Sequence, residues 1–468
     1  MSDRPVEPPD PARRRFFRQF AGEVATSMGS VLGAAQVLQQ QSAEAARDLL
    51  AGDPATGAAA GSTATVAGLR APTPEIDAST AGWRAPFRWD GDVCWVVDQR
   101  RLPDRLGDVP VRGAADAVTA VNDGSISGGA VIAQLAAVTL ALVAGRSVSS
   151  RAFARRATIR GAASALRQTR PASAATALAL DRMLALLESL GNEAPGDAVE
   201  AALRREAEAI ISEASADHGA VVGHALQLLP GGPEDPLHVL LAGSTGAMGS
   251  GQFGTALSAI ITAHHAQRRV HALVAEGRPG LEGARVATWE LAQAGVPHAL
   301  VTDAAAPACI ADGEVAAVLV TAERVCANGD VVATAGTYPL ALAAHAAGVP
   351  FLVLVATSAV DLGTPDGDAA TIEEGRPGPV LTAAGTRIAP EATPIRNPRQ
   401  DRTPASLVTT IVTEEGGLAA PFAEGLAAHV RAAETRRAVA PGMAALLAAR
   451  AAAGAPMAAG AAAPGRAS

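Results

Sequence analysis

Short apolar segments alternate with helical segments between residues 238 and 357, and this alternation restricts the fold more than any other feature. The segments predicted as strands are apolar at nearly every position rather than at every second one. Strands of this kind are buried on both faces, as in a parallel sheet that helices cover on each side. The sequence therefore predicts an α/β fold. The predicted strands are HVLLA, VHALVAE, HALVTD, AAVLVTAE and FLVLVAT.

A different pattern precedes this region. Between residues 113 and 225, apolar residues recur at intervals of three and four, and glycine and proline separate the runs, which predicts a layer of helices. One strand, DVCWVVD at 92–98, is expected before them. We therefore expect four regions: an N-terminal extension of one helix and a flexible linker (1–80), a helical N-terminal domain (81–229), an α/β domain (230–416) and alanine-rich C-terminal helices or tail (417–468).

Composition narrows the possible partners and compartment. The net charge of −8 argues against a broad nucleic-acid surface, and we expect no membrane partner. The three cysteines show no C-x-x-C spacing, which favours a reducing compartment, the cytoplasm. Residues 12–18 resemble a twin-arginine export signal, but Glu23 interrupts the apolar region that should follow. A basic amphipathic surface helix is the favoured interpretation of this segment.

A glycine-rich loop follows the first predicted strand of the α/β region. Gly249, Gly251 and Gly254 fit G-x-G-x-x-G, and Glu276 lies 22 residues after Gly254, as in a dinucleotide-binding unit. In that motif the first glycine closes the strand, whereas Gly249 comes well after Leu241, where the strand is expected to end. We therefore predict no nicotinamide cofactor. The loop can still offer backbone N–H groups to an anion.

The carboxyl ends of the predicted strands indicate where a ligand binds. In an open parallel sheet these ends meet at one edge, where ligands bind. The residues there mix acids, arginines, hydroxyls and glycines, which suits a small phosphorylated or polyhydroxylated ligand. Any single acid at such a position is more often a helix cap or a salt-bridge partner. The segments concerned are 243–254, 276–279, 302–303, 322–324 and 356–358, with Asn328, Asp330 and Asp361 in nearby loops.

A set of motifs between residues 83 and 416 resembles one family. They include Asp98–Pro103, Thr169–Pro171, Gly254–Leu257, Ala327–Asp330, Ile372–Glu374 and Asn397–Pro398. In this order and spacing they resemble methylthioribose-1-phosphate isomerase, whose family includes ribose-1,5-bisphosphate isomerase and the regulatory subunits of initiation factor two-B. The resemblance implies a helical N-terminal domain, a Rossmann-like C-terminal domain and a homodimer. It also implies conversion of an aldose 1-phosphate to a ketose 1-phosphate without metal or nicotinamide.

The sequence departs from the family at the positions that would contact substrate. Gly243 stands where the family has its catalytic cysteine, and Glu323 stands where it has its catalytic aspartate. Ala333 and Thr334 replace an Asn-Lys pair, Ser127-Gly128-Gly129 replaces Arg-Gly-Ala, and Glu282 replaces a glutamine, while Arg170 is retained. The loss of two cations and the added anion imply weaker binding of a sugar phosphate, because charge-assisted contacts are the strong ones.

The resemblance thus implies one catalytic candidate and a set of substrate-binding candidates. Glu323 is the candidate general acid. Cys326, three residues further on, could supply sulfur, although a small buried core residue is the commoner role for such a cysteine. The two main alternatives are an isomerase with a changed substrate or mechanism and a non-catalytic relative that binds a metabolite or a protein. A third, an NAD-dependent oxidoreductase, rests on the glycine loop alone. The substrate-binding candidates are Gly128, Gly129, Arg170, Gly243, Ser244, Glu282, Asn328 and Asp330, and no metal ligand is predicted.

Overall fold

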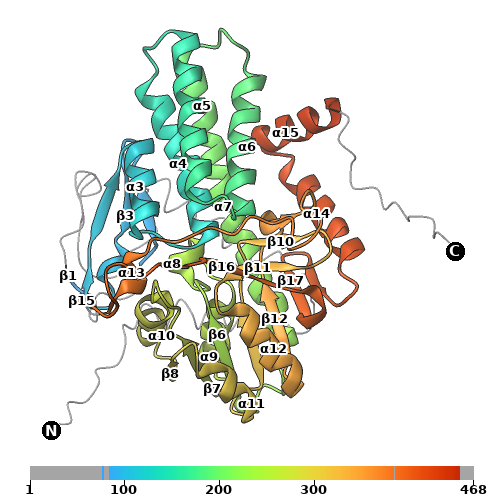
Figure 1. Cartoon of the computed structure of the whole chain (residues 1–468). Helices are drawn as coiled ribbons and strands as arrows, with labels where there is room; N and C mark the ends of the chain where they lie inside the picture. Colours follow the sequence, from blue (N-terminus) through green and yellow to red (C-terminus); the bar gives the residue numbers. More distant parts are fainter. Residues whose placement is uncertain (1–75, 79–83, 384, 454–468) are drawn as a thin grey trace, which may run out of the picture.

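The computed structural model describes residues 76–78, 84–383 and 385–453. A layer of helices lies at the top of Figure 1 and a parallel sheet with its own helices lies below. The segment that resembles an export signal and most of the predicted linker lie outside the described residues.

The main sheet has seven strands in the order β18-β17-β12-β9-β6-β7-β8, of which only the edge strand β18 is antiparallel. The predicted parallel sheet is therefore present, and the five strands predicted from the sequence are all in it. The strands are β6 (Leu237–Ala242), β7 (Val270–Ala275), β8 (His298–Val301), β9 (Ala317–Val320), β12 (Phe351–Leu354), β17 (Thr410–Thr413) and β18 (Gly416–Leu418).

The direction in which strands are added reverses between β6 and β9. From β6 the chain adds β7 and β8 on one side, then returns to place β9, β12 and β17 on the other. At such a reversal the connections leave in opposite directions and open a crevice at the carboxyl ends of the two strands. The loops after Ala242 and Val320 therefore border the position where a ligand is expected.

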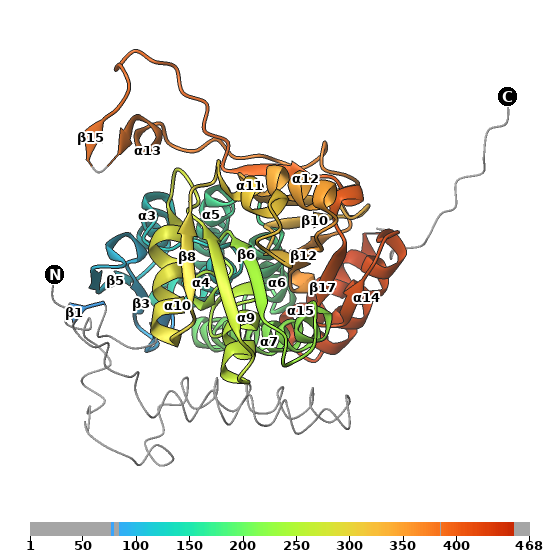
Figure 2. The same cartoon turned by 90° about the horizontal axis from the view of Figure 1, so that it is seen from below.

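Helices cover both faces of the sheet (Figure 2). Neighbouring residues of one strand point to opposite faces, and since both are apolar, each face must be buried. Leu241 packs in a core with α7 and α9, whereas Leu240 packs in a core with α11 and α12. Since both cores are almost wholly aliphatic, the strands carry no alternation of polar residues. The helices of this part are α8 (Ala247–Ser250), α9 (Ala256–His265), α10 (Thr288–Ala294), α11 (Ala306–Ala311) and α12 (Thr337–Ala347).

The helical layer surrounds one apolar helix, α4. Every residue of α4 from Val131 to Ala144 is buried. Within the described chain, α4 is the one helix long and apolar enough to cross a membrane, but here α5, α6 and α7 pack around it as a core helix. The layer consists of α3 (Ala114–Asp123), α4 (Gly129–Arg146), α5 (Ala152–Thr169), α6 (Ala174–Ser189) and α7 (Gly196–Leu228).

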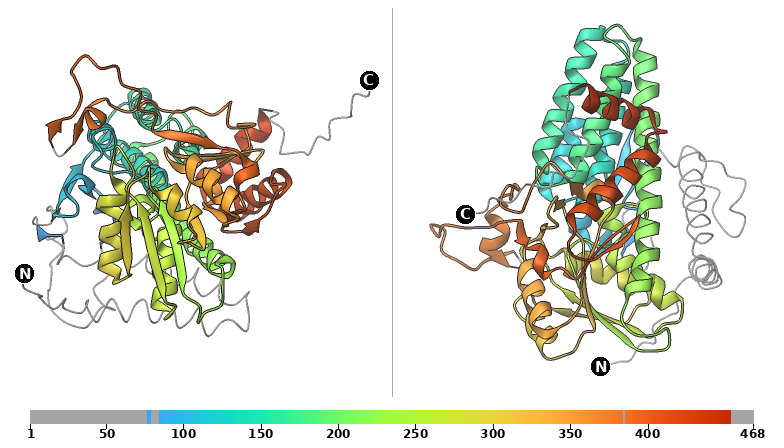
Figure 3. Two further views of the ribbon diagram at one scale, coloured as in Figure 1. Left: turned by 60° about the horizontal axis from the view of Figure 1, so that its bottom comes forward. Right: turned by 90° about the vertical axis from the view of Figure 1, so that its right-hand side faces the viewer.

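The helical layer and the sheet share α7. This helix packs on α4 at one end and reaches β17 and β18 at the other (Figure 3). The domain boundary at residues 229 and 230 stays a prediction, because α7 ends there after packing on both parts. Helices α14 (Ala423–Arg437) and α15 (Pro441–Ala452) form the C-terminal part, and α15 packs on α6.

Four smaller sheets accompany the main one in the described chain, and apart from the strand β3 the sequence does not predict the two larger of them. One sheet lies beside the helical layer, so residues 81–229 are not wholly helical. The other carries the chain onward from Glu323. Their strands are only two to four residues long, too short for a periodic pattern. They are β2 (Phe87–Trp89), β3 (Cys94–Val97) and β5 (Asp108–Val111), and β10 (Arg324–Cys326), β11 (Val331–Thr334), β13 (Val360–Asp361) and β16 (Gln400–Thr403).

Candidate functional site

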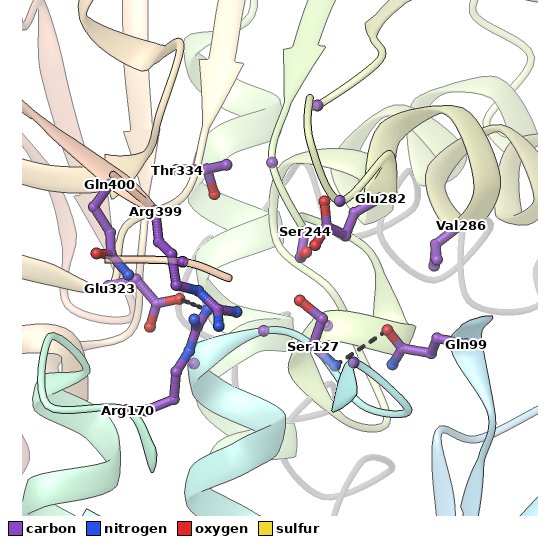
Figure 4. A pocket seen from close by; sticks show the side chains of 18 of the residues that line it. Gln99, Ser127, Arg170, Ser244, Glu282, Val286, Glu323, Thr334, Arg399 and Gln400 are labelled. Carbon is purple, nitrogen blue, oxygen red and sulfur yellow. Dashed lines mark hydrogen bonds and ion pairs between the residues drawn. The ribbon is translucent and has the colours of Figure 1, made fainter. Parts of the chain in front are cut away.

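A cavity of about 830 Å³ lies at the carboxyl ends of β6 and β9. The loops after β6, β7 and β9 line it from the sheet side, the amino end of α4 lines it from the helical layer, and residues 375–379 and 397–400 lie along it. Figure 4 shows the side chains that point into it. The cavity therefore occupies the position that the reversal in strand order predicts.

Glu323 and Arg170 form a buried ion pair in this cavity. The Arg170 Nη2 donates to Glu323 Oε1 at 2.7 Å, and its Nη1 donates to Glu373 Oε2 at 3.3 Å. Arg170 is 6% exposed and Glu323 9%. The pKa of Arg170 is raised, since Glu323, Glu373 and Glu282 together outweigh the burial that would lower it. Arg170 therefore holds two carboxylates rather than standing free for a phosphate.

Three buried polar atoms, two of them in this pair and one on a neighbouring residue, have no hydrogen-bond partner among the described residues. They are Glu323 Oε2, Arg170 Nε and Gln400 Nε2, and all three residues line the cavity. An unpaired buried polar atom costs about 1–3 kcal/mol. A ligand with its own donors and acceptors can offset that cost. Glu323 Oε2 in particular is an ionisable oxygen left available for proton transfer.

Arg399 adds a second cation to the group. Its Nε lies 3.7 Å from Glu373 Oε2, and burial together with the nearby charge of Arg170 lowers the pKa of Arg399. Gln400 accepts from the backbone N–H of Glu373 at 3.0 Å. The segment 397–400 thus brings one charge and two amides, those of Asn397 and Gln400, to the cavity.

The amino end of α4 approaches the glycine loop so closely that side chains are excluded. Gly128 has a φ of +113°, and a Cβ there would overlap the backbone of Gly249. A Cβ on Gly129 would overlap Glu323 Oε2. Gln99 joins the two segments, since its Oε1 accepts from the Ser127 N–H at 3.2 Å and its Nε2 donates to the Met248 carbonyl at 2.9 Å.

Gly243, the first residue after β6, has a left-handed backbone. Its φ is +81°, a backbone conformation that residues other than glycine rarely adopt. A Cβ built there would lie 3.4 Å from Thr334 Oγ1, at ordinary contact distance. The position therefore has room for a side chain but disfavours one through its backbone. Ser244 follows it and lines the cavity.

The cavity contains seven of the nine site residues predicted from the sequence. Asn328 and Asp330 do not line it. Asp330 instead accepts from the N–H groups of Gly367 and Ala405, and Asn328 Oδ1 accepts from the Asp330 N–H at 2.8 Å. These two side chains stabilise a turn. The candidates that line the cavity are Gly128, Gly129, Arg170, Gly243, Ser244, Glu282 and Glu323.

Other polar residues at the predicted strand ends have structural roles. Asp303 accepts from the N–H groups of Gly277 and Arg278, and Asp361 pairs with Arg324. Cys326 is fully buried against Val332, and burial raises the pKa of its thiol to about 11. It does not line the cavity, so the interpretation of Cys326 as a core residue agrees with the structure.

Sequence reasoning missed most of the cationic side chains. Six arginines line the cavity against three carboxylates. The argument that lost cations weaken anion binding considered only aligned family positions, so it did not count these arginines. Among these arginines, Arg278 could have been predicted, since it follows a predicted strand. The arginines are Arg100, Arg170, Arg278, Arg285, Arg376 and Arg399, and the carboxylates are Asp123, Glu282 and Glu323.

The fold and the cavity define an α/β protein with a cavity at the switch point of a parallel sheet. A model of the Initiation factor 2 subunit family matches residues 125–420, and the chain belongs to this family. A methylthioribose-1-phosphate isomerase of Chloroflexus aurantiacus is 38% identical over 338 residues, 72% of this chain and 96% of that protein. One from Thermus thermophilus is 38% identical over 345 residues, 73% and 96% of the two chains.

Two solved structures have the same fold over most of the chain. A 5-methylthioribose 1-phosphate isomerase from Pyrococcus horikoshii OT3 superimposes with a TM-score of 0.65 at 28% identity, covering 78% of this chain and 99% of the other. The delta subunit of the translation initiation factor eIF-2B from A. fulgidus gives 0.62 at 25% identity, covering 75% and 100%. The resemblance found in the sequence motifs is therefore confirmed at the level of the family.

Proposed function

We propose that the cavity binds a phosphorylated sugar and catalyses its isomerisation from aldose to ketose, with Glu323 as the acid–base group. The observation that carries the proposal is the state of the Glu323 carboxylate. One oxygen is held by Arg170, and the other is buried in the cavity without a partner. The relatives named as methylthioribose-1-phosphate isomerases support the same reaction class.

The reaction has two stages, opening of the sugar ring and transfer of a proton from C2 to C1. For a cyclic aldose 1-phosphate, a proton must reach the ring oxygen as the bond from C1 to that oxygen breaks. A base then takes the proton from C2, which leaves an enol between C1 and C2. Return of a proton to C1 and loss of the proton on the C2 oxygen give the ketose with its phosphate retained. A single carboxylate between C1 and C2 can carry the second transfer, because it accepts and returns the same proton.

Glu323 is positioned for that transfer by groups on both sides. Arg170 fixes Oε1, and the close approach of Gly129 fixes the location of Oε2. No cysteine lies among the residues that line the cavity, and the hydroxyls of Ser244 and Thr255 ionise too little to replace a thiol near neutral pH. The proposed mechanism therefore uses carboxylate chemistry and differs from one built on a cysteine.

The test is turnover of purified protein with methylthioribose 1-phosphate, 5-deoxyribose 1-phosphate and ribose 1,5-bisphosphate. We expect Glu323→Gln to lower kcat by about 10²- to 10⁴-fold, the usual contribution of a general base. Glu314→Gln, on the surface and outside the cavity lining, is the matched control and keeps full activity. Equal activity of the Glu323→Gln and wild-type proteins would refute the assignment.

The second candidate is a relative that binds a metabolite or a protein without turning anything over. The backbone of Gly243 favours it, because a residue with φ of +81° holds no side chain where the family has its catalytic thiol. Saturable binding of a sugar phosphate with no product would support this candidate over the first.

We also propose that the chain is a cytoplasmic homodimer, as its family relation implies. Light scattering during size-exclusion chromatography should give twice the mass of one chain. A single-chain mass at micromolar concentration would exclude the dimer.

A further inference from the structure

One group of charged side chains at the cavity, built around Arg170, carries an excess of negative charge. Arg170 and Arg399 interact electrostatically with Glu282, Glu323 and Glu373. At formal charges, two arginines therefore face three glutamates. This group, in which Glu373 contacts Arg170 without lining the cavity, lacks one cation.

Three other arginines that line the cavity have the opposite excess. Arg376 is exposed, and Arg278 and Arg285 are half-buried. In the described part of the chain none of these three forms an ion pair with an acidic side chain. Arg278 donates to the Pro379 carbonyl at 3.2 Å and Arg285 to the Arg100 carbonyl at 3.3 Å, both neutral acceptors. Their charges are thus available to an anion.

Glu282 is the member of the Arg170 group that has no direct partner. Its carboxylate has no hydrogen bond or ion pair with any residue that the structure describes, whereas Glu323 and Glu373 are both held by Arg170. In Figure 4, Glu282 and Ser244 lie on one side of the cavity, and Glu323, Arg170, Arg399 and Gln400 on the other. Arg170 and Arg399 act on Glu282 only through space, and a carboxylate in a partly enclosed site without a directly paired cation is unfavourable.

We propose that the ligand of this cavity is a sugar phosphate that also carries a protonated amino group, with the ammonium against Glu282 and the phosphate against Arg278, Arg285 and Arg376. The proposal rests on the proposed function in that the ligand is a phosphorylated sugar, but it concerns recognition and not turnover.

The two ends of such a ligand match the two charge excesses. An ammonium has three donors, which can reach the Glu282 carboxylate and the Ser244 hydroxyl and bring the missing positive charge. A neutral hydroxyl at the same place leaves that charge uncompensated, and a second phosphate is repelled by it. The cavity volume of about 830 Å³ exceeds the need of a small sugar phosphate and lies within the usual range for ligand pockets, about 300–1,000 Å³.

The experiment compares two ligands that differ only at one group. Glucosamine 1-phosphate and glucose 1-phosphate carry an ammonium and a hydroxyl on the same carbon, and calorimetry gives the Kd of each for the full-length protein. We expect the amino sugar to bind at least about tenfold more tightly, the usual gain for a charge-assisted contact. Glu282→Gln, which keeps the shape and removes the charge, should abolish that ratio. Glu314→Gln, with the same change of net charge, should keep it.

A second variant tests the orientation. Replacing both Arg278 and Arg376 by alanine should weaken the two ligands by the same factor and leave their ratio unchanged. Equal affinity of wild-type protein for the two sugars, a preference that survives Glu282→Gln, or binding of neither sugar would each overturn the proposal. If only the proposed isomerisation is wrong, methylthioribose 1-phosphate is not turned over, but the two amino and hydroxy sugars still differ in Kd. The two proposals can therefore fail separately.

Discussion

At the scale of single residues, Gly243 shows how a backbone conformation can decide which side chains a site holds. The Cβ of an added residue meets only Thr334 at contact distance, so the left-handed φ of +81° is the main obstacle. We expect Gly243→Ala and Gly243→Cys each to lower the free energy of unfolding by about 1–2 kcal/mol, measured with urea. Gly243→Cys alone should also add a thiol that reacts rapidly in the native protein. Unchanged stability of both variants would contradict the strain argument.

The sequence could predict those site residues that follow directly after predicted strands. Gly243, Ser244 and Glu323 lie at the ends of β6 and β9, where the apolar pattern stops. Arg399 and Gln400 carry no comparable signal, because they come from a segment without periodic pattern. Sequence alone also cannot show that Asp330 is engaged by backbone N–H groups, since its partners are 37 and 75 residues away.

At the scale of elements, the two glycines at opposite ends of α4 make a matched pair for mutation. A Cβ at Gly129 would displace the Glu323 carboxylate, whereas one at Gly145 would meet only Glu200 Cγ at 3.6 Å. We expect Gly129→Ala to reduce turnover or ligand affinity about tenfold or more while the fold persists, since about 1 Å of misplacement can cost 10²-fold. Gly145→Ala should raise stability by about 0.5–1 kcal/mol and leave the site unchanged. Equal effects of the two variants would show that the approach of α4 does not position Glu323.

Element prediction succeeded where the pattern was long and failed where it was short. Helix α4 and five of the seven strands of the main sheet are recognisable because apolar residues fill them at nearly every position. The four-stranded sheet that includes β10 and β11 is held by pairing between segments as far apart as Val331 and Thr403. Pairing of that kind depends on tertiary contacts, which a local pattern does not report.

At the scale of the whole molecule, one buried ion-pair network joins the helical layer, the sheet and the C-terminal helices. Arg437 of α14 bonds Asp217 of α7 at 2.6 Å and Glu414, just after β17, at 2.7 Å. Glu414 also accepts from the Thr357 N–H at 2.8 Å, beside residues that line the cavity. The C-terminal helices therefore belong to the network that holds Thr357, which lies between two residues of the cavity lining.

This network makes stability depend on pH in a direction that can be worked out. Burial, assisted by Asp217 and opposed by Arg437, raises the pKa of Glu414 to about 7 from its ordinary value of 4.5. Between those pH values the folded state keeps a proton on Glu414 that the unfolded state has lost. The contribution of this group to the free energy of unfolding is therefore largest below about pH 4.5 and falls as the pH rises toward 7. The slope is at most about 1.4 kcal/mol per pH unit. We expect Glu414→Gln to remove this slope in urea unfolding measured from pH 5 to 7, and Glu391→Gln, on the surface, to retain it. Parallel curves for wild type and Glu414→Gln would place the titrating group elsewhere, because glutamine stays uncharged throughout this range.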